Sequence, residues 1–340
     1  MTEPTHAVTM PEPAEPTIYD VARIAGVAPS TVSRALSKPG RVSFKTAEHV
    51  RRVADKLGYR SQKLERPVSA RGTGMLAIIV ADIANPVFFG MIRGAERAAH
   101  AGGFTMLVVE TQESEPIERD AVDRLLPLVD GVILSASRMG DQAIRNVAKR
   151  TPVVLLNRTV AEVSSVISDN VNAIKKATEH LVGLGHTSIC YLAGPEASWA
   201  DGVRWRGLRE AGLDLDLQVR RLGPFLPTIR GGTQAAEQWA AKPSTGVIAY
   251  NDLMAIGFMQ GVMAAGRSVP RDVSVIGFDN IVDDTLVEPH LTSIASPLVS
   301  LGSAAVSHLL RSRRTDEATA EPVVLPARLV VRESTGPQVR

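Results

Sequence analysis

From Met75 onward the chain alternates short apolar runs with stretches of helical periodicity, and this alternation restricts the fold more than any other feature. Apolar runs bounded by polar residues indicate strands that are buried on both faces. Helical stretches between them, such as 87–101 and 171–185, supply the crossovers that parallel strands require. Repeated βα units in this number predict two doubly wound lobes. The expected strands are Met75–Val80, Phe104–Val109, Val132–Leu134, Val153–Leu156, Ile189–Leu192, Val247–Tyr250 and Val273–Ile276.

The charge of the chain is concentrated near its start. Residues 17–72 hold 12 Lys and Arg against 4 Asp and Glu, in a chain whose net charge is only +2. This excess indicates a polyanionic partner, although a solvated basic face would give the same count. Residues 1–16 are rich in Pro and Glu, have no apolar centre like that of a secretory signal, and are expected to be a disordered tail.

Two short helices joined by a tight turn are expected within this basic segment. Thr17 is a good N-cap for a helix that ends at Gly26, and Pro29 suits the first turn of a second helix that reaches Leu36. A third helical pattern follows Ser43 and would cover the other two. Such a pair with a turn containing glycine is a helix-turn-helix.

The second helix of this motif enters the major groove of DNA in proteins that use it. Its polar side carries Ser30 and Arg34, which we expect to read base edges, with Pro29 offering apolar contact. Alternatively, the Ser and Thr hydroxyl groups of this segment only cap helices and bind water. The residues expected to hold phosphates are Thr17, Tyr19, Thr31, Ser33, Ser37 and Arg41.

The segment Thr17–Leu36 resembles the N-terminal motif of the lactose-repressor (LacI/GalR) family of bacterial transcriptional regulators, and Gly58-Tyr59-Arg60 resembles the end of its third helix. Similarity continues through Asn85–Phe89, Leu184-Gly185-His186 and Gly277-Phe278-Asp279. The resemblance implies a multidomain chain: an all-α helix-turn-helix head at 17–60, a hinge and linker at 61–74, and an α/β periplasmic-binding-protein-like effector domain of two doubly wound lobes at 75–340. It further implies a repressor that binds double-stranded operator DNA as a homodimer, without a cofactor or metal.

Polar residues at the strand ends independently indicate a ligand site, because ligands bind beyond the carboxyl ends of doubly wound sheets. Carboxylates, amides and an arginine can each bind neighbouring hydroxyl groups, although Asp169 and Asp252 are equally good helix caps. The strand-end set is Asp82, Asn157-Arg158, Asp169-Asn170, Asn251-Asp252 and Asp279-Asn280. By resemblance, base reading falls on Pro29, Ser30 and Arg34, phosphate contacts on Thr17, Tyr19, Thr31, Ser33 and Arg41, and effector contacts on Phe88, Arg158, Arg204, Phe225, Asn251 and Asp279.

The expected hinge departs from the family. Its members have an Ala-Arg pair and then a Leu that wedges into the minor groove, whereas this chain has Glu65, Arg66, Pro67 and Val68. Proline disfavours helix in the residue before it. We therefore expect a weak or truncated hinge helix, with Val68 or Leu64 as a poorer wedge.

Two other classes of protein fit the sequence less well. An enzyme is disfavoured because the usual nucleophile, metal and phosphate-loop motifs do not occur. A secreted sugar receptor would have the same two lobes, but the basic segment near the start of the chain would have no function in it. The single cysteine and the lack of a long apolar run predict a cytoplasmic protein that does not enter the membrane. The expected effector is a sugar or sugar derivative; its identity, its role as inducer or co-repressor, and assembly beyond a dimer stay open.

Overall fold

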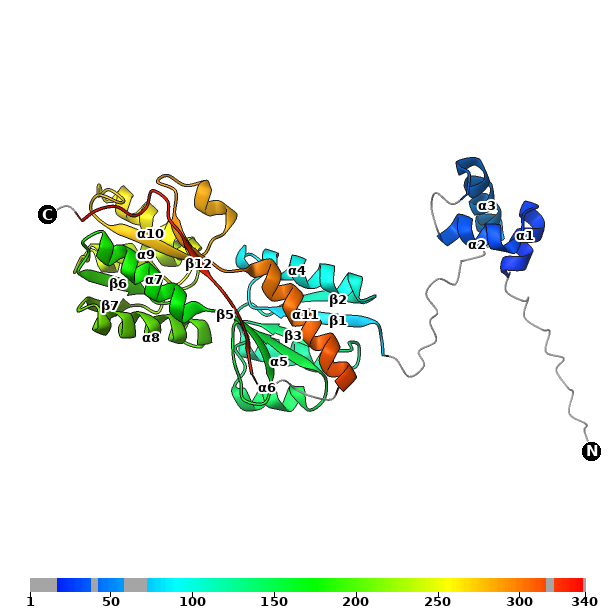
Figure 1. Ribbon diagram of the computed structural model, residues 1–340, viewed down its shortest axis with the longest axis horizontal. Helices are drawn as coiled ribbons and strands as arrows, with labels where there is room; N and C mark the ends of the chain where they lie inside the picture. The colour runs from blue at the N-terminus through cyan, green and yellow to red at the C-terminus, as the bar shows by residue number, and fades with distance from the viewer. Residues whose placement is uncertain (1–16, 38–41, 58–71, 316–320, 339–340) are drawn as a thin grey trace, which may run out of the picture. The chain divides into compact units, whose positions relative to one another are not determined.

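The computed structural model describes residues 17–37, 42–57, 72–315 and 321–338. The chain forms two compact units that meet in sequence between Arg71 and Gly72, and each is described by itself (Figure 1). The expected tail at 1–16, Arg41, and the hinge with Leu64 and Val68 lie outside the described residues.

The first unit is a helical head. Gly26 ends the first helix with φ = 66°, a left-handed conformation that glycine adopts without strain, and the chain turns there into the second helix. Val21, Val32 and Val50 come from three different helices and are completely buried together. This shared core confirms the predicted helix-turn-helix with a third covering helix. The helices are α1 (Ile18–Ala25), α2 (Pro29–Ser37) and α3 (Phe44–Lys56).

The second unit contains two lobes, each built on a six-stranded sheet. In lobe 1 the strand order is β11-β5-β4-β3-β1-β2, and all pairs are parallel. Helices α4 and α11 pack on one face of this sheet, and α5 and α6 pack on the other. The strands are β1 (Met75–Val80), β2 (Thr105–Glu110), β3 (Val132–Ser135), β4 (Val153–Leu156), β5 (Ser164–Ser168) and β11 (Val323–Leu325); the helices are α4 (Val87–Ala101), α5 (Glu115–Leu125), α6 (Asp141–Ala148) and α11 (Leu298–Thr315).

Lobe 2 repeats this arrangement with the strand order β12-β10-β9-β8-β6-β7, in which only β12 is antiparallel. Helices α9 and α10 cover one face of the sheet, and α7 and α8 cover the other. The strands are β6 (Ser188–Leu192), β7 (Gln218–Leu222), β8 (Gly246–Ala249), β9 (Ser274–Asp279), β10 (Thr292–Ala295) and β12 (Arg328–Val330); the helices are α7 (Asn170–Gly183), α8 (Trp199–Asp214), α9 (Ile229–Trp239), α10 (Asp252–Ala264) and the 3₁₀ turn η1 (Val282–Thr285).

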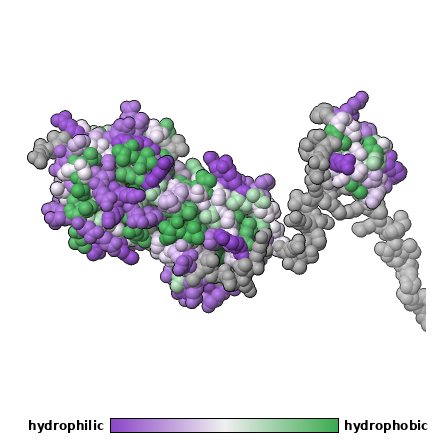
Figure 2. Space-filling view, in the orientation of Figure 1, coloured by the Kyte–Doolittle hydropathy of each residue, from purple (hydrophilic) through white to green (hydrophobic). Residues whose placement is uncertain are grey.

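The backbone passes between the lobes three times: from β5 to α7, from β10 to α11 and from β11 to β12 (Figure 1). The two predicted doubly wound lobes are confirmed, and the seven predicted strands all occur within a few residues of their expected bounds. One detail was wrong: β2 is not buried on both faces, because it lies at the edge of its sheet and stays partly exposed. Hydrophilic side chains are spread over both lobes, with apolar patches between them (Figure 2).

Candidate functional site

The polar side of α2 is open to solvent while its other side is held in the core of the head. Val32 and Ala35 are buried, whereas Ser30 and Arg34 are exposed. Pro29 and Ser33 are exposed as well, and Thr31 is half-buried. The helix therefore presents an arginine and several hydroxyl groups on one accessible surface, as base and phosphate contacts require.

Thr17 and Tyr19 stand at the start of α1 in different environments. The backbone N–H and the hydroxyl of Thr17 both donate to Asp20 Oδ2, at 2.9 and 2.7 Å, so Thr17 caps the helix. These hydrogen bonds from Thr17, together with one from Arg23, lower the pKa of Asp20 to about 2. The Tyr19 ring is 70% exposed and is free to meet another surface. The side chains of Ser37 and Arg41 lie outside the described part of the head.

A cavity lies where the carboxyl ends of the two sheets face each other. Residues at or after the ends of β1, β2, β3 and β4 line it from lobe 1, and residues at or after the ends of β6, β7, β8 and β9 line it from lobe 2. The volume of the cavity is about 40 Å³. Its lining is Asn85, Val87, Phe88, Met91, Glu113, Ser135, Ala136, Arg138, Asn157, Ala200, Arg204, Pro227, Tyr250, Asn251 and Asp279.

Arg204 and Asp279 form a buried ion pair in the lobe 2 wall of this cavity. Arg204 Nη2 lies 3.4 Å from Asp279 Oδ1, and both side chains are less than a tenth exposed. The guanidinium also donates to the carbonyl oxygen of Tyr250 and lies 3.5 Å above the Phe278 ring. Burial raises the pKa of Asp279 to about 6, although the neighbouring Arg204 acts in the opposite direction. The pair joins strong donors to a strong acceptor in a largely buried site.

A second ion pair lines the cavity from lobe 1. Arg138 Nε donates to Glu113 Oε2 at 2.6 Å, and the Arg138 side chain is only 4% exposed. Arg138 also interacts electrostatically with the side chain of Tyr250, which belongs to lobe 2 and lines the same cavity. Burial disfavours the Arg138 guanidinium, but Tyr250 and Glu113 outweigh burial and raise its pKa. The cavity thus has an arginine–carboxylate pair on each side.

Backbone strain is concentrated at the same edge. Four residues that line the cavity have positive φ angles, although none is glycine, and such conformations cost on the order of 1–3 kcal/mol each. They follow four different strands, so the strain is a shared property of the strand ends. They are Glu113 (φ 58°), Ala136 (φ 56°), Asn157 (φ 53°) and Asp279 (φ 106°).

The structure brings together four of the six residues that the sequence assigned to the effector: Phe88, Arg204, Asn251 and Asp279. Phe88 is 4% exposed, and Asn251 donates to Pro227 O at 3.1 Å while capping α10 through Met254 N. The other two do not line the cavity. Phe225 packs in the core of lobe 2, next to the segment that carries Pro227.

Arg158 points into lobe 1 rather than into the cavity. Its Nη1 donates to the carbonyl oxygens of Ser137 and Met139, at 2.8 and 2.6 Å, and its Nη2 lies 2.7 Å from Asp141 Oδ1. These contacts fix the loop that carries Arg138. The same loop is held from the other side by Glu118, which accepts a hydrogen bond from Arg138 N at 2.7 Å and whose pKa is raised by burial.

Two of the strand-end residues, Asp169 and Asp252, stabilise the fold. Asp169 caps α7 by accepting a hydrogen bond from Asn172 N at 3.2 Å. Asp252 accepts hydrogen bonds from Ser293 Oγ and Ile281 N within the core of lobe 2, where burial raises its pKa well above its ordinary value.

Sequence reasoning missed Arg138, Glu113 and Tyr250 as members of the cavity. A signal was available, because each follows the carboxyl end of β2, β3 or β8 within three residues. Glu113 and Arg138 lie in the loops beyond the strand ends, and Tyr250 falls within the expected strand Val247–Tyr250.

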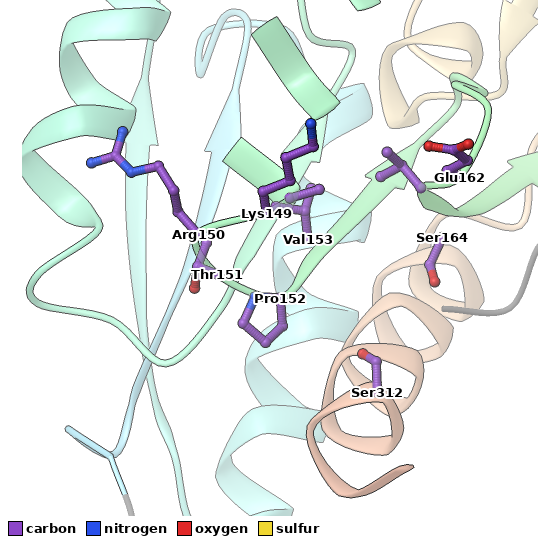
Figure 3. A pocket seen from close by; sticks show the side chains of 10 residues that line it. Lys149, Arg150, Thr151, Pro152, Val153, Glu162, Ser164 and Ser312 are labelled. Atoms are coloured by element: carbon purple, nitrogen blue, oxygen red, sulfur yellow. The ribbon is translucent and has the colours of Figure 1, made fainter. Parts of the chain in front are cut away.

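A larger cavity, of about 290 Å³, opens at the amino end of β4, the opposite edge of the lobe 1 sheet (Figure 3). Its basic residues do not converge: Arg150 points away from Glu162 and Ser164, and its Nη1 lies 2.8 Å from Asp123 Oδ1. Both partners in this ion pair are more than half exposed. We therefore assign no ligand to this cavity.

The described residues contain no helix of the length and apolar character that crossing a membrane demands. They also contain no group of three or more His, Cys, Asp and Glu side chains arranged to hold a metal ion.

Comparison with protein families gives two matches. Residues 17–62 match the family described as bacterial regulatory proteins, lacI family, and residues 178–335 match the periplasmic binding protein-like domain. The chain is 31% identical over 333 residues to the HTH-type transcriptional regulator DegA of Bacillus subtilis (strain 168), which covers 94% of this chain and 98% of that protein. It is 32% identical over 329 residues to the HTH-type transcriptional repressor CytR of Escherichia coli (strain K12), covering 94% and 96%.

Solved structures agree with these matches. The lac repressor dimer bound to operator and the anti-inducer ONPF superposes with a TM-score of 0.77 at 27% identity, covering 95% of this chain and all of that one. The complex of the transcriptional regulator CelR with cellobiose gives a TM-score of 0.71 at 29% identity, covering 94% and 99%. A lacI-family regulator from Enterococcus faecium with bound ribose gives 0.69 at 29% identity, covering 77% and 99%.

Proposed function

The chain belongs to the lacI family of bacterial transcriptional regulators, and we propose that it binds operator DNA as a homodimer whose affinity is set by a sugar or sugar derivative held between its two lobes. Regulators of this family are DNA-binding proteins and not enzymes. The finer statements, which concern the dimer, the ligand and the residues, rest on the site itself and on what the relatives bind.

The observation that carries the proposal is the buried Arg204–Asp279 pair at the strand-end cavity. An arginine and a carboxylate side by side bind neighbouring hydroxyl groups well, because one donates hydrogen bonds and the other accepts them. The solved relatives hold cellobiose and ribose, which are both polyhydroxylated. In this chain we assign Phe88, Asn251, Arg204 and Asp279 to the ligand.

For the operator we assign the exposed side of α2. Arg34 is the residue that pairs with guanine, Ser30 and Pro29 contact neighbouring bases, and Tyr19, Thr31 and Ser33 hold phosphates. One helix-turn-helix covers only a half-site, so two heads are needed for a near-palindromic operator. The lac repressor relative is a dimer on its operator. Ligand binding changes the relation between the lobes and so alters operator affinity, by roughly 5- to 150-fold for typical couplings.

The test begins with selection of the operator from a library of random duplexes by the full-length protein. Operator affinity is then measured by fluorescence anisotropy with and without D-ribose, D-xylose, D-glucose and cellobiose. We expect one or more of these sugars to change the affinity of the wild type, and Asp279→Ala to bind the operator without responding. If no duplex is preferred over random competitor at moderate salt, the assignment of the operator surface is wrong.

A further inference from the structure

The cavity contains a second arginine–carboxylate pair that the proposed function does not use. Arg138 and Glu113 come from the loops after β3 and β2, whereas Arg204 and Asp279 belong to α8 and β9 of the other lobe. The two pairs thus lie on opposite walls of one cavity. Each combines a nearly buried guanidinium with a carboxylate at hydrogen-bonding or ion-pair distance.

The first pair is held firmly by its own lobe. Arg158 fixes the carbonyl oxygens on either side of Arg138, and Glu118 accepts the backbone N–H of Arg138 itself. Glu113 is kept in a left-handed conformation, and its N–H donates to Ala81 O at 2.8 Å. A surface ion pair needs no such support, and replacing a buried pair by apolar side chains is often neutral for stability. So much fixed geometry around a buried pair indicates that it recognises another molecule.

We propose that Arg138 and Glu113 form a second ligand-binding pair, which binds the end of a neutral polyhydroxyl ligand opposite to the end held by Arg204 and Asp279. This inference rests on the proposed function, because it places the same ligand in the same cavity. Neutral ligands are favoured because each guanidinium already faces a carboxylate, which leaves little net positive charge for a phosphate or carboxylate group.

The proposal also accounts for the contact between the lobes. Arg138 of lobe 1 and Tyr250 of lobe 2 interact electrostatically across the cavity. The cavity holds only about 40 Å³, whereas small-molecule sites usually span about 300–1,000 Å³. A sugar must therefore separate the lobes, and it would then lie between Arg138 and Tyr250. Both lobes then bind the ligand directly instead of each other.

The test is titration calorimetry of the full-length protein with D-ribose, D-xylose, D-glucose, cellobiose and D-ribose 5-phosphate. The variants are Glu113→Gln and Arg138→Lys, which keep size or charge but lose the paired geometry, with circular dichroism to check folding. The matched control is Arg119→Ala, which removes an exposed arginine–glutamate pair with Glu115 from the same lobe. For every sugar that binds the wild type, we expect each variant to lower the affinity by about 10- to 100-fold. The control should leave the affinity unchanged.

The outcomes separate this inference from the proposed function. If Glu113→Gln and Arg138→Lys keep wild-type affinity while Asp279→Asn loses it, Arg138 and Glu113 do not bind the ligand, but the cavity is still the ligand site. If Asp279→Asn also keeps wild-type affinity, the cavity is not the ligand site and the proposed function fails. Tighter binding of D-ribose 5-phosphate than of D-ribose, or no binding of any sugar by the wild type, overturns the neutral polyhydroxyl class.

Discussion

Arg204 of α8 lies directly over the ring of Phe278, with its Cζ 3.5 Å from the ring centroid, while its Nη2 reaches Asp279 in the next position of β9. One guanidinium thus contacts two consecutive residues of a strand end. Both contacts of Arg204 come from the same strand end. Any shift of the Arg204 side chain toward a ligand would therefore break its contacts with Phe278 and Asp279. This places a rigid wall on the lobe 2 side of the cavity.

The first prediction concerns Asp279 and pH. Its pKa is about 6 in the folded protein against an ordinary value of 3.8, so folding favours the protonated form. The stability that this gives is fully present below pH 3.8 and is lost as the pH rises through 6. Asp279→Asn should therefore raise the free energy of unfolding at pH 7.5 by up to about 3 kcal/mol and have no effect near pH 4. Urea unfolding at pH 4, 5.5 and 7.5 checks this; a difference that does not change with pH would contradict it.

The second prediction concerns Arg158, which the family resemblance assigns to the effector. Its side chain satisfies two backbone carbonyls and Asp141 within lobe 1. Arg158→Ala should lower the free energy of unfolding by about 2–3 kcal/mol, because these buried acceptors lose their partner. Chemical denaturation measures this loss. A variant of wild-type stability with weakened sugar binding would instead show that Arg158 touches the ligand.

The third prediction concerns the packing of α4 on α11. A Cβ atom on Gly94 would lie 2.0 Å from the carbonyl oxygen of Val299, so a side chain there must push the two helices apart. Gly94→Ala should cost about 1–3 kcal/mol or more of unfolding free energy. The control is Gly202→Ala in α8, where a Cβ meets nothing within 4 Å, and where alanine should stabilise the helix by about 0.5–1 kcal/mol. Equal melting temperatures for the two variants would refute the close approach.

The fourth prediction concerns the operator surface. Arg34→Ala should lower affinity for the selected operator by about 1–3 kcal/mol, because a bidentate contact to guanine is lost. Binding to random duplex should change little, since phosphate contacts dominate it. Arg23→Ala is the control: Arg23 is also exposed on the head but pairs with Asp20 at 3.2 Å, and it should leave the preference for the operator intact. Anisotropy titrations with both duplexes measure the two affinities.

Much of the fold could be predicted from the sequence because its strongest signals are local. Short apolar runs such as those of β1, β4 and β6, with helical stretches between them, are typical of buried parallel strands, and the head begins at a recognisable cap and turns at a glycine. Strands β5, β7 and β10 escaped prediction because they are short and carry serine, arginine or threonine. Their strand conformation depends on pairing with neighbours that are distant in sequence.

Cavity residues could be predicted where they lie at or just after the end of a strand, as Asn251 and Asp279 do. Arg158 was misplaced because a strand end allows a side chain to point either into the cavity or back into its own lobe. Only the carbonyl oxygens of Ser137 and Met139, brought there by the tertiary fold, decide which way it points. By holding these two carbonyl oxygens, Arg158 also fixes the loop that places Arg138 in the cavity.

The three passages of the backbone between the lobes have a consequence for hybrid regulators. Neither lobe corresponds to one uninterrupted stretch of coding sequence, since lobe 1 also requires α11 and β11, which come after most of lobe 2. With the head kept, exchange of lobe 1 with that of a relative would need four splice points in the chain, and exchange of lobe 2 would need three. The helical head, in contrast, is continuous in sequence and can be exchanged at one junction. A new operator preference is therefore easier to transfer between relatives than a single lobe.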